Sequence, residues 1–388
     1  MRKRILLIEP AYKTKFPPLG LMKISTYHKR QGDEIAFYKG TNVELRDKKW
    51  DIIYIATMFT YKWNITLKTI KFYKRNKANN NIKIGGVLAS LMSNELENET
   101  GIKPHFGLYK KVDRVPPDYT IADNYYTNNI SLGYMTRGCI RKCPFCAVPK
   151  LEPEYFHFIP LKGQIDLNRK DLVLLDNNVL ASDEFENIIQ EIKKYGFYKG
   201  AKLNGKLRYV DFNQGIDARL LTEEKMKLLS EIAIKPLRIA FDNIKLKKLY
   251  IEKIKLAHKY GIRHLSNYIL FNYKDTPEDF YERLRINIEL NDKLGLSIYS
   301  FPMKFVPLNA KDRRYIAPHW TKAQLRGVQC ILHATHGVVG PKRPFFEKAF
   351  GKDVSEFKYI IEQPEEHIFY RNKMEEYKGQ RSNKSKKG

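Results

Sequence analysis

The chain has 388 residues, enough for two domains or for one large domain with extensions. Hydrophobic residues make up 43% of the sequence and aromatic residues 13%, which excludes a largely disordered chain. Lysine and arginine total 70 against 43 acidic residues, so the formal net charge of +27 indicates either a polyanionic partner or the codon bias of an AT-rich genome.

The first 115 residues alternate between strand and helix patterns. Strands are predicted at 4–9, 34–38, 51–57 and 82–84, and helices at 21–31 and 65–75. This alternation is typical of a parallel, doubly wound sheet, because consecutive parallel strands need a crossover between them. We therefore expect a Rossmann-like domain at 1–115, followed by a linker that contains the two prolines at 116–117.

A second alternating series is predicted between residues 126 and 310. Its strands are expected at 171–175, 208–212, 237–241, 265–271 and 296–301, and its helices at 183–195, 222–232, 245–260 and 277–291. Ser182 and Thr222 are expected N-caps, and Pro277 suits the first turn of the last helix. Repeated βα units of about 30 residues predict a barrel or part of one. Residues 311–388 should form a small, mostly helical extension that ends in a basic disordered tail.

The sequence contains no uncharged apolar run near the roughly 20 residues that a membrane span needs. Its basic start is followed by an apolar stretch too short for a secretory signal. Three of the four cysteines lie within eight residues, unlike the spread cysteines of an extracellular disulfide framework. We expect a soluble, cytoplasmic protein with no membrane partner.

The three clustered cysteines, Cys139, Cys143 and Cys146, have the spacing C-x3-C-x2-C. Three thiolates on one loop can hold three irons of a four-iron cluster and leave the fourth iron open. Electron-transfer clusters usually have four cysteine ligands, and structural zinc sites have four ligands. The motif therefore predicts a reactive metal centre. A zinc site completed by Cys330 or by a histidine is the alternative.

With an aromatic residue directly before its last cysteine, this motif resembles the signature of the radical S-adenosylmethionine (SAM) superfamily. The resemblance implies that the three cysteines bind a [4Fe-4S] cluster whose open iron takes the amino and carboxylate groups of SAM. One electron then cleaves SAM to methionine and a 5′-deoxyadenosyl radical. The resemblance also implies a partial (βα)6 barrel for the second series and a reductant such as flavodoxin or ferredoxin as partner.

The resemblance suggests further cofactor-binding residues near the first strand ends. Phe145 would lie beside the adenine of SAM, with packing under the loop as the alternative. Asp176, Asn177 and Asn178 follow a predicted strand at the place where the family's Gly-Gly-Glu-like motif holds the SAM amino group. This sequence lacks that motif, so their oxygens would have to replace it. An N-cap or turn role is the alternative for these three residues.

Polar residues also follow the next two predicted strands. Gln214 or Asp217 would meet the ribose hydroxyls of SAM, and Arg219 would pair with its carboxylate. Asp242 occupies a similar place after the next strand. A structural salt bridge between Asp217 and Arg219, or with a neighbour, is the competing interpretation.

The N-terminal domain resembles the cobalamin-binding-like Rossmann domain that precedes some radical SAM barrels. The resemblance lies in residues 5–10, 18–20 and 84–86. The Asp-x-His-x-x-Gly motif of some cobalamin proteins is absent from residues 1–125. We therefore expect a degenerate domain and favour the absence of cobalamin over its presence, with substrate docking as the competing role.

These observations together predict a radical SAM enzyme, and the net charge suggests a nucleic acid or nucleotide as substrate. A small-molecule or peptide substrate is the alternative, as is a non-catalytic iron–sulfur or zinc module that binds nucleic acid. Polar residues at the strand ends favour the enzyme, because a binding module does not need them there. Lys342, Arg343 and the tail at 381–388 are candidate phosphate contacts. Cys330 is expected to be a buried helical thiol, or to line a substrate cavity with His333.

Overall fold

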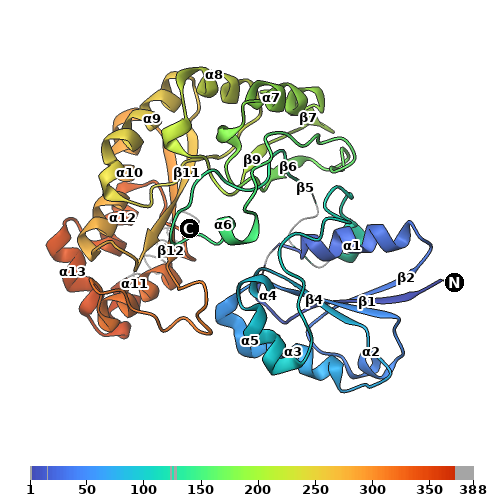
Figure 1. Cartoon of the computed structure of the whole chain (residues 1–388). Coiled ribbons are helices and arrows are strands. Elements are labelled where there is room, and N and C mark those ends of the chain that lie inside the picture. Colours follow the sequence, from blue (N-terminus) through green and yellow to red (C-terminus); the bar gives the residue numbers. More distant parts are fainter. Residues whose placement is uncertain (1, 15, 123–124, 126–128, 372–388) are drawn as a thin grey trace, which may run out of the picture. The chain divides into compact units, whose positions relative to one another are not determined.

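The computed structural model describes residues 2–14, 16–122, 125 and 129–371 (Figure 1). The chain divides into two compact units. The first comprises the chain up to residue 214 together with 306–315, and the second comprises 215–305 and the described residues from 316 onward. Within the described residues, no helix is both long enough and apolar enough to cross a membrane. The predicted domain boundaries at 1–115, 126–310 and 311–388 stay predictions.

The first unit begins with a four-stranded parallel sheet in the order β2-β1-β3-β4. Its strands are β1 (Arg4–Glu9), β2 (Glu34–Lys39), β3 (Ile52–Thr57) and β4 (Ile82–Gly86). The helices around it are α1 (Leu19–Lys29), α2 (Val43–Asp47), α3 (Trp63–Lys74), α4 (Val87–Leu91) and α5 (Ser93–Thr100). Two short 3-10 turns, η1 (Thr60–Lys62) and η2 (Tyr119–Ala122), complete this region.

Both faces of this sheet are covered by helices (Figure 1). Ile5 and Leu7 of β1 point to the face that packs against α1. Leu6 and Ile8 point to the opposite face, in one core with residues of α3, α4 and α5. Burial on both faces explains why β1 is apolar along nearly its whole length. The predicted doubly wound, Rossmann-like domain is therefore confirmed.

The first unit also contains a second parallel sheet in the order β5-β6-β9. Its strands are β5 (Ile130–Gly133), β6 (Asp171–Leu174) and β9 (Val210–Phe212). Between them lie α6 (Val148–Leu151), η3 (Val179–Ala181), α7 (Phe185–Lys194) and a hairpin of β7 (Lys202–Leu203) and β8 (Lys206–Leu207). The predicted N-cap at Ser182 lies two residues too early, because α7 begins at Phe185 with Glu184 at the capping position, although the Ser182 hydroxyl still accepts from the Glu184 N–H at 3.0 Å.

The second unit contains a third parallel sheet in the order β10-β11-β12. Its strands are β10 (Leu237–Arg238), β11 (His264–Phe271) and β12 (Ser297–Lys304). Its helical segments are η4 (Ala218–Leu220), α8 (Glu223–Glu231), η5 (Ile244–Leu246), α9 (Lys247–Lys259) and α10 (Pro277–Leu294). The Thr222 side chain accepts from the Lys225 N–H at 3.3 Å, so the predicted cap of α8 is confirmed. Pro277 lies in the first turn of α10, as predicted.

Three further helices follow the third sheet in the same unit: α11 (Lys322–Ala334), α12 (Arg343–Phe350) and α13 (Val354–Glu362). Aromatic side chains of α10, α12 and α13 form their common core. Phe357 lies 6.1 Å from Phe280 and 5.2 Å from Tyr281 between ring centroids. This confirms the predicted mostly helical extension. The predicted basic tail at 381–388 lies outside the described residues.

Candidate metal and cofactor site

The three predicted cluster ligands lie on one loop of the first unit, residues 137–147, termed here the cysteine loop. The Cys146 N–H donates to the Cys143 carbonyl at 3.0 Å and closes a tight turn. Pro144 occupies the second position of this turn, where its fixed φ is favoured. All three cysteines are half-buried. The turn thus places Cys143 and Cys146 at its two ends.

N–H groups donate hydrogen bonds to the sulfur atoms of Cys139 and Cys146. The Sγ of Cys139 accepts from the Arg141 N–H at 3.3 Å and from Nδ2 of Asn178 at 3.5 Å. The Sγ of Cys146 accepts from the Val148 N–H at 3.5 Å. Such donors stabilise negative charge on sulfur and tune the reduction potential of clusters. The donor set therefore fits thiolate ligands of an iron–sulfur cluster.

A single metal ion and a four-iron cluster make different demands on the three thiolates of the cysteine loop. Within the described part of the chain, no three Cys, His, Asp or Glu side chains are grouped so that they can hold one metal ion. A tetrahedral zinc site needs such a group, because all of its ligands bind one atom. Three thiolates of a four-iron cluster bind three different irons and need not converge. The cluster and the zinc site both stay predictions at this loop.

Asp176 follows β6 and is almost fully buried, with 1% of its surface exposed. Its Oδ1 accepts from the Met135 N–H at 2.9 Å, from the Thr136 N–H, and from the Thr136 hydroxyl at 2.7 Å. Burial raises the pKa of Asp176 to about 6, although these three bonds act in the opposite direction. Its Oδ2 has no hydrogen-bond partner among the described residues. Asp176 therefore positions the chain that enters the cysteine loop and retains an unused acceptor.

Asn177 and Asn178 also reach the surroundings of the cysteine loop. Besides the bond from Asn178 Nδ2 to Cys139, the Asn178 carbonyl accepts from the Tyr155 hydroxyl at 2.8 Å. The Oδ1 of Asn178 is buried and lacks a partner in the part of the chain that the structure describes. Phe145 lies half-buried within the turn of the loop. The structure thus brings these residues near the cysteines, and their contacts with SAM stay predictions.

Glu152 and Arg137 belong to the site although the sequence analysis missed them. The Oε2 of Glu152 accepts from the Gly138 N–H at 2.9 Å, and its Oε1 accepts from Nη1 of Arg137 at 3.0 Å. Nη2 of Arg137 also pairs with Asp113, and its guanidinium lies 3.7 Å from the centroid of the Tyr134 ring. A signal was present in the sequence: both are charged residues that flank the cysteine motif.

Lys23 of α1 extends this group of charges. It is 4% exposed, its Nζ donates to the Asp113 carbonyl, and it lies 5.4 Å from the Tyr134 ring centroid. Burial lowers the pKa of Lys23 to about 8, with Asp113 opposing the shift and Arg137 adding to it. The N-terminal helix therefore contributes a buried amine to the surroundings of the cysteine loop.

Replacing Lys23 with methionine should change how stability depends on pH. Between pH 8 and 10.5 the unfolded chain holds a proton on this amine that the folded chain has lost. The free energy of unfolding of the wild type relative to Lys23→Met should therefore rise across this range, by up to about 3 kcal/mol. Urea unfolding of both proteins at several pH values measures the difference, and a difference that stays constant would contradict the lowered pKa.

The residues predicted to meet the ribose and carboxylate of SAM fall in different units. Gln214 is exposed after β9 in the first unit. In the second unit, Asp217 caps η4, and the Arg219 guanidinium donates to its two carboxylate oxygens at 2.7 and 3.1 Å. This two-bond pair is the salt bridge that the sequence analysis considered as the competing interpretation. Contacts of Gln214, Asp217 and Arg219 with SAM stay predictions.

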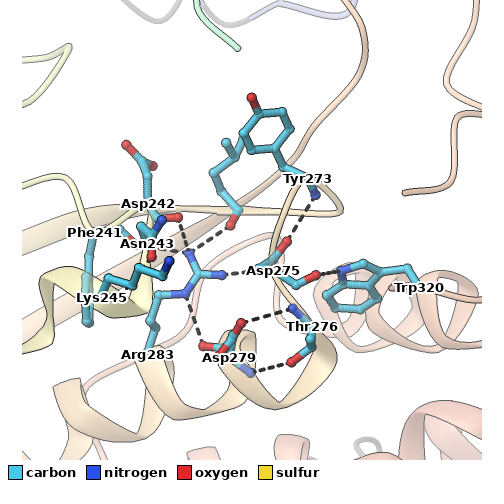
Figure 2. Close-up of polar contacts among 11 residues, drawn as sticks. Phe241, Asp242, Asn243, Lys245, Tyr273, Asp275, Thr276, Asp279, Arg283 and Trp320 are labelled. Carbon is cyan, nitrogen blue, oxygen red and sulfur yellow. Dashed lines mark hydrogen bonds and ion pairs between the residues drawn. The ribbon is translucent and has the colours of Figure 1, made fainter. Parts of the chain in front are cut away.

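The second unit contains a buried arginine that the sequence analysis missed (Figure 2). Arg283 of α10 is fully buried. Its Nη1 donates to the carbonyls of Phe241, Asp242 and Leu270 at 3.1, 3.0 and 2.8 Å, and its Nη2 pairs with Asp275 at 2.7 Å. Burial raises the pKa of the Asp242 carboxyl, while Arg283 opposes the shift. Asp242 thus lies beyond the end of β10, which ends at Arg238 and not at the predicted residue 241, and Arg283 holds its carbonyl there.

Similar solved structures include two of the radical SAM methyltransferase TsrM from Kitasatospora setae. The structure with cobalamin and a [4Fe-4S] cluster bound has a TM-score of 0.55 and 14% sequence identity, over 85% of this chain and 78% of that one. The structure with tryptophan substrate and the SAM analogue aza-SAM bound has a TM-score of 0.54 and 14% identity, over 74% and 71%. No family model matches the sequence, and no curated protein matches it either.

These likenesses concern the fold. They confirm the predicted α/β class: a Rossmann-like N-terminal domain is followed by further parallel sheets and a helical C-terminal extension. The chain thus shares its fold with a radical SAM methyltransferase that was solved with cobalamin and a [4Fe-4S] cluster bound, which agrees with the resemblance of the cysteine motif.

Proposed function

We propose that this protein is a radical SAM enzyme whose Cys139, Cys143 and Cys146 hold a [4Fe-4S] cluster. The observation that carries the proposal is the cysteine loop, with its C-x3-C-x2-C spacing, its closing turn and its N–H donors to sulfur. When bound, such a cluster supplies the electron that cleaves SAM to methionine and a 5′-deoxyadenosyl radical. The fold shared with TsrM supports the same conclusion.

The residues after β6 suit the positively charged amino group of SAM. The Oδ2 of Asp176 and the Oδ1 of Asn178 are buried acceptors with no partner among the described residues. A buried acceptor without a partner costs about 1–3 kcal/mol, and an ammonium group has three N–H donors to offer. Burial raises the pKa of Asp176 to about 6, and a cation bound beside the carboxyl would lower that pKa again. We assign to Asp176 and Asn178 the role of orienting this amino group.

The proposed activity is tested by anaerobic reconstitution with iron and sulfide. The wild type should take up about four irons per chain and release 5′-deoxyadenosine and methionine from SAM in the presence of dithionite. Mass spectrometry of the products provides the measurement, and a variant with all three loop cysteines replaced by alanine is the control. One zinc and no iron in anaerobically purified protein would contradict the proposal.

We further propose that the N-terminal domain binds cobalamin, although the sequence favoured its absence. The strand order reverses between β1 and β3, and sheets of this kind bind ligands beyond the carboxyl ends of the strands at that point. There Tyr12 packs against Phe59 with ring centroids 5.6 Å apart, and the neighbouring Met58 is 38% exposed. An apolar edge suits the face of a corrin ring. The cobalamin in the similar TsrM structure supports this assignment.

A charge at this edge should weaken cobalamin binding. Met58→Glu should reduce the affinity for hydroxocobalamin by about tenfold or more, because a carboxylate would lose solvent against the corrin. Met303→Glu is the matched control, since Met303 is 50% exposed on β12 of the second unit. Absorbance of bound cobalamin after gel filtration gives the measurement. Equal retention by the two variants would contradict the proposed edge.

Of the predicted substrate classes, we propose the small molecule. TsrM, which shares the fold, has been solved with tryptophan as substrate. Among the candidate phosphate contacts, Arg343 is already paired with Asp292 at 2.7 Å. Incubation with methyl-deuterated SAM and separate pools of amino acids, RNA and DNA tests the assignment by the mass of the labelled product.

A further inference from the structure

We propose that Glu152 is a positioning residue for the cluster, and that Arg137 and Asp113 hold Glu152 in place. The proposal rests on the proposed function, since it assumes that the cysteine loop holds a cluster. All of the residues that carry it belong to the first unit. The role assigned to Glu152 is to fix the backbone directly before Cys139.

One oxygen of Glu152 joins the two segments that surround Cys139. Its Oε2 accepts from the Gly138 N–H at 2.9 Å and from Nδ2 of Asn177 at 3.2 Å. The next residue, Asn178, donates to the Cys139 sulfur. The Glu152 side chain is only 13% exposed, and bonds to a carboxylate are roughly twice as strong as those between neutral groups. A displacement of this carboxylate would therefore displace Cys139 and the donor to its sulfur together.

The backbone around Glu152 is pressed against the start of the cysteine loop. Arg137 and Phe156 exchange two backbone hydrogen bonds, at 3.3 and 3.0 Å, in an antiparallel bridge. The next residue, Gly138, lies so close to Glu154 that a Cβ on residue 138 would overlap the Glu154 carbonyl. Residues 152–156 therefore pack against the start of the cysteine loop, and the Glu152 side chain forms hydrogen bonds from this segment to the loop.

Buried charges fix Glu152 from the other side. The Arg137 side chain is 7% exposed and pairs with Glu152 at 3.0 Å and with Asp113. Lys23 of α1 donates to the Asp113 carbonyl. The network thus has two cations, Arg137 and Lys23, and two anions, Glu152 and Asp113. Removing either anion would leave the buried Arg137 without one of its partners. Through Asp113 and Lys23 this network also ties the N-terminal domain to the cysteine loop.

The reduction potential of the cluster reports whether the charges of Glu152 and Arg137 lie close enough to act on it, and iron release reports whether Glu152 holds the loop in place. A carboxylate beside a cluster opposes the addition of an electron, and a guanidinium favours it. Glu152→Gln should therefore shift the midpoint potential of the cluster to a more positive value, and Arg137→Met to a more negative one. General destabilisation would give no such opposite pair of shifts.

The experiment compares full-length variants after anaerobic reconstitution. Iron release to a chelator should be about tenfold faster in Glu152→Ala than in the wild type, because two bonds to a charged acceptor are lost. Glu152→Gln should be intermediate, because its amide oxygen can still accept from Gly138. Asp33→Asn is the matched control, since Asp33 forms a buried pair with His28 at 2.7 Å in the same unit. Redox titration followed by electron paramagnetic resonance gives the midpoint potentials.

The outcomes separate this proposal from the proposed function. Unchanged iron release and an unchanged potential in Glu152→Gln, with a normal wild-type cluster, would overturn the positioning role alone. A wild type that takes up no iron would overturn the proposed function and the positioning role together. If Glu152→Ala does not fold, the comparison of Glu152→Gln with Arg137→Met decides, because opposite potential shifts are expected only if both side chains act on the cluster.

Discussion

Alanine in place of Cys139, Cys143 or Cys146 is expected to leave the protein without its cluster. Each thiolate would hold a different iron, and no fourth cysteine in the first unit can replace a missing one. Iron should therefore fall from about four per chain towards zero in every single variant, with loss of the brown colour. Iron and sulfide analysis with visible absorbance after anaerobic reconstitution measures the effect.

Cys330→Ala is the control for this prediction. Cys330 lies on α11 of the second unit and is 6% exposed. Burial raises the pKa of its thiol, so it holds its proton more tightly and is a poor metal ligand near neutral pH. This variant should keep the full iron content. Full iron in any one of the three loop variants would show that the cysteine concerned is not a ligand.

Gly138→Ala is expected to disrupt the cysteine loop with all three cysteines still present. Gly138 has a φ of +72°, which a residue with a Cβ rarely adopts. The added Cβ would overlap the Glu154 carbonyl oxygen and lie 3.1 Å from the Glu152 carbonyl oxygen. Because these atoms belong to the backbone, they cannot relieve the overlap by a change of rotamer, as a side chain could. We expect a loss of about 3 kcal/mol or more in unfolding free energy, together with loss of iron.

Gly163→Ala separates the steric effect from the backbone strain. Gly163 has a similar φ of +76° in the same unit, but a Cβ there would meet no atom within 4 Å. It should cost only about 1–2 kcal/mol and leave the iron content unchanged. Urea unfolding of the metal-free variants and iron analysis of the reconstituted ones give the comparison. Equal losses in the two variants would mean that Gly138 is required for its φ alone.

The parts of the fold that the sequence predicted are those with a strong local signal. The apolar run at 4–9, the capping Thr222 and the N-terminal Pro277 each encode their element within a few residues. Ser182 shows the limit of that reasoning. It has the chemistry of an N-cap, but the 3-10 turn before it shifts the start of α7 by two residues. Very short helices such as α2 and α4 had too few positions for a periodic pattern.

The candidate site shows the same division between local and distant information. The spacing of three cysteines within eight residues is visible in the sequence alone. The contacts that hold the loop cannot be read from the sequence, because the partners are distant along the chain. Arg137 contacts Asp113, 24 residues away, and Thr136 contacts Asp176, 40 residues away. Arg219 illustrates the reverse case. It was predicted to meet SAM, and the structure shows it paired with Asp217, two residues away.

The contacts of Arg283 should make the segments around β10, β11 and the start of α10 unfold together. Besides its bonds to Asp275, to Leu270 of β11 and to Phe241 beyond β10, its Nε donates to the Asp279 carbonyl at 3.1 Å. If any of these segments opened alone, a buried guanidinium would lose a partner without gaining water. Partial opening is therefore suppressed, and the backbone amides here should exchange with solvent only when the whole unit unfolds. A single side chain should thus make the unfolding of these segments cooperative.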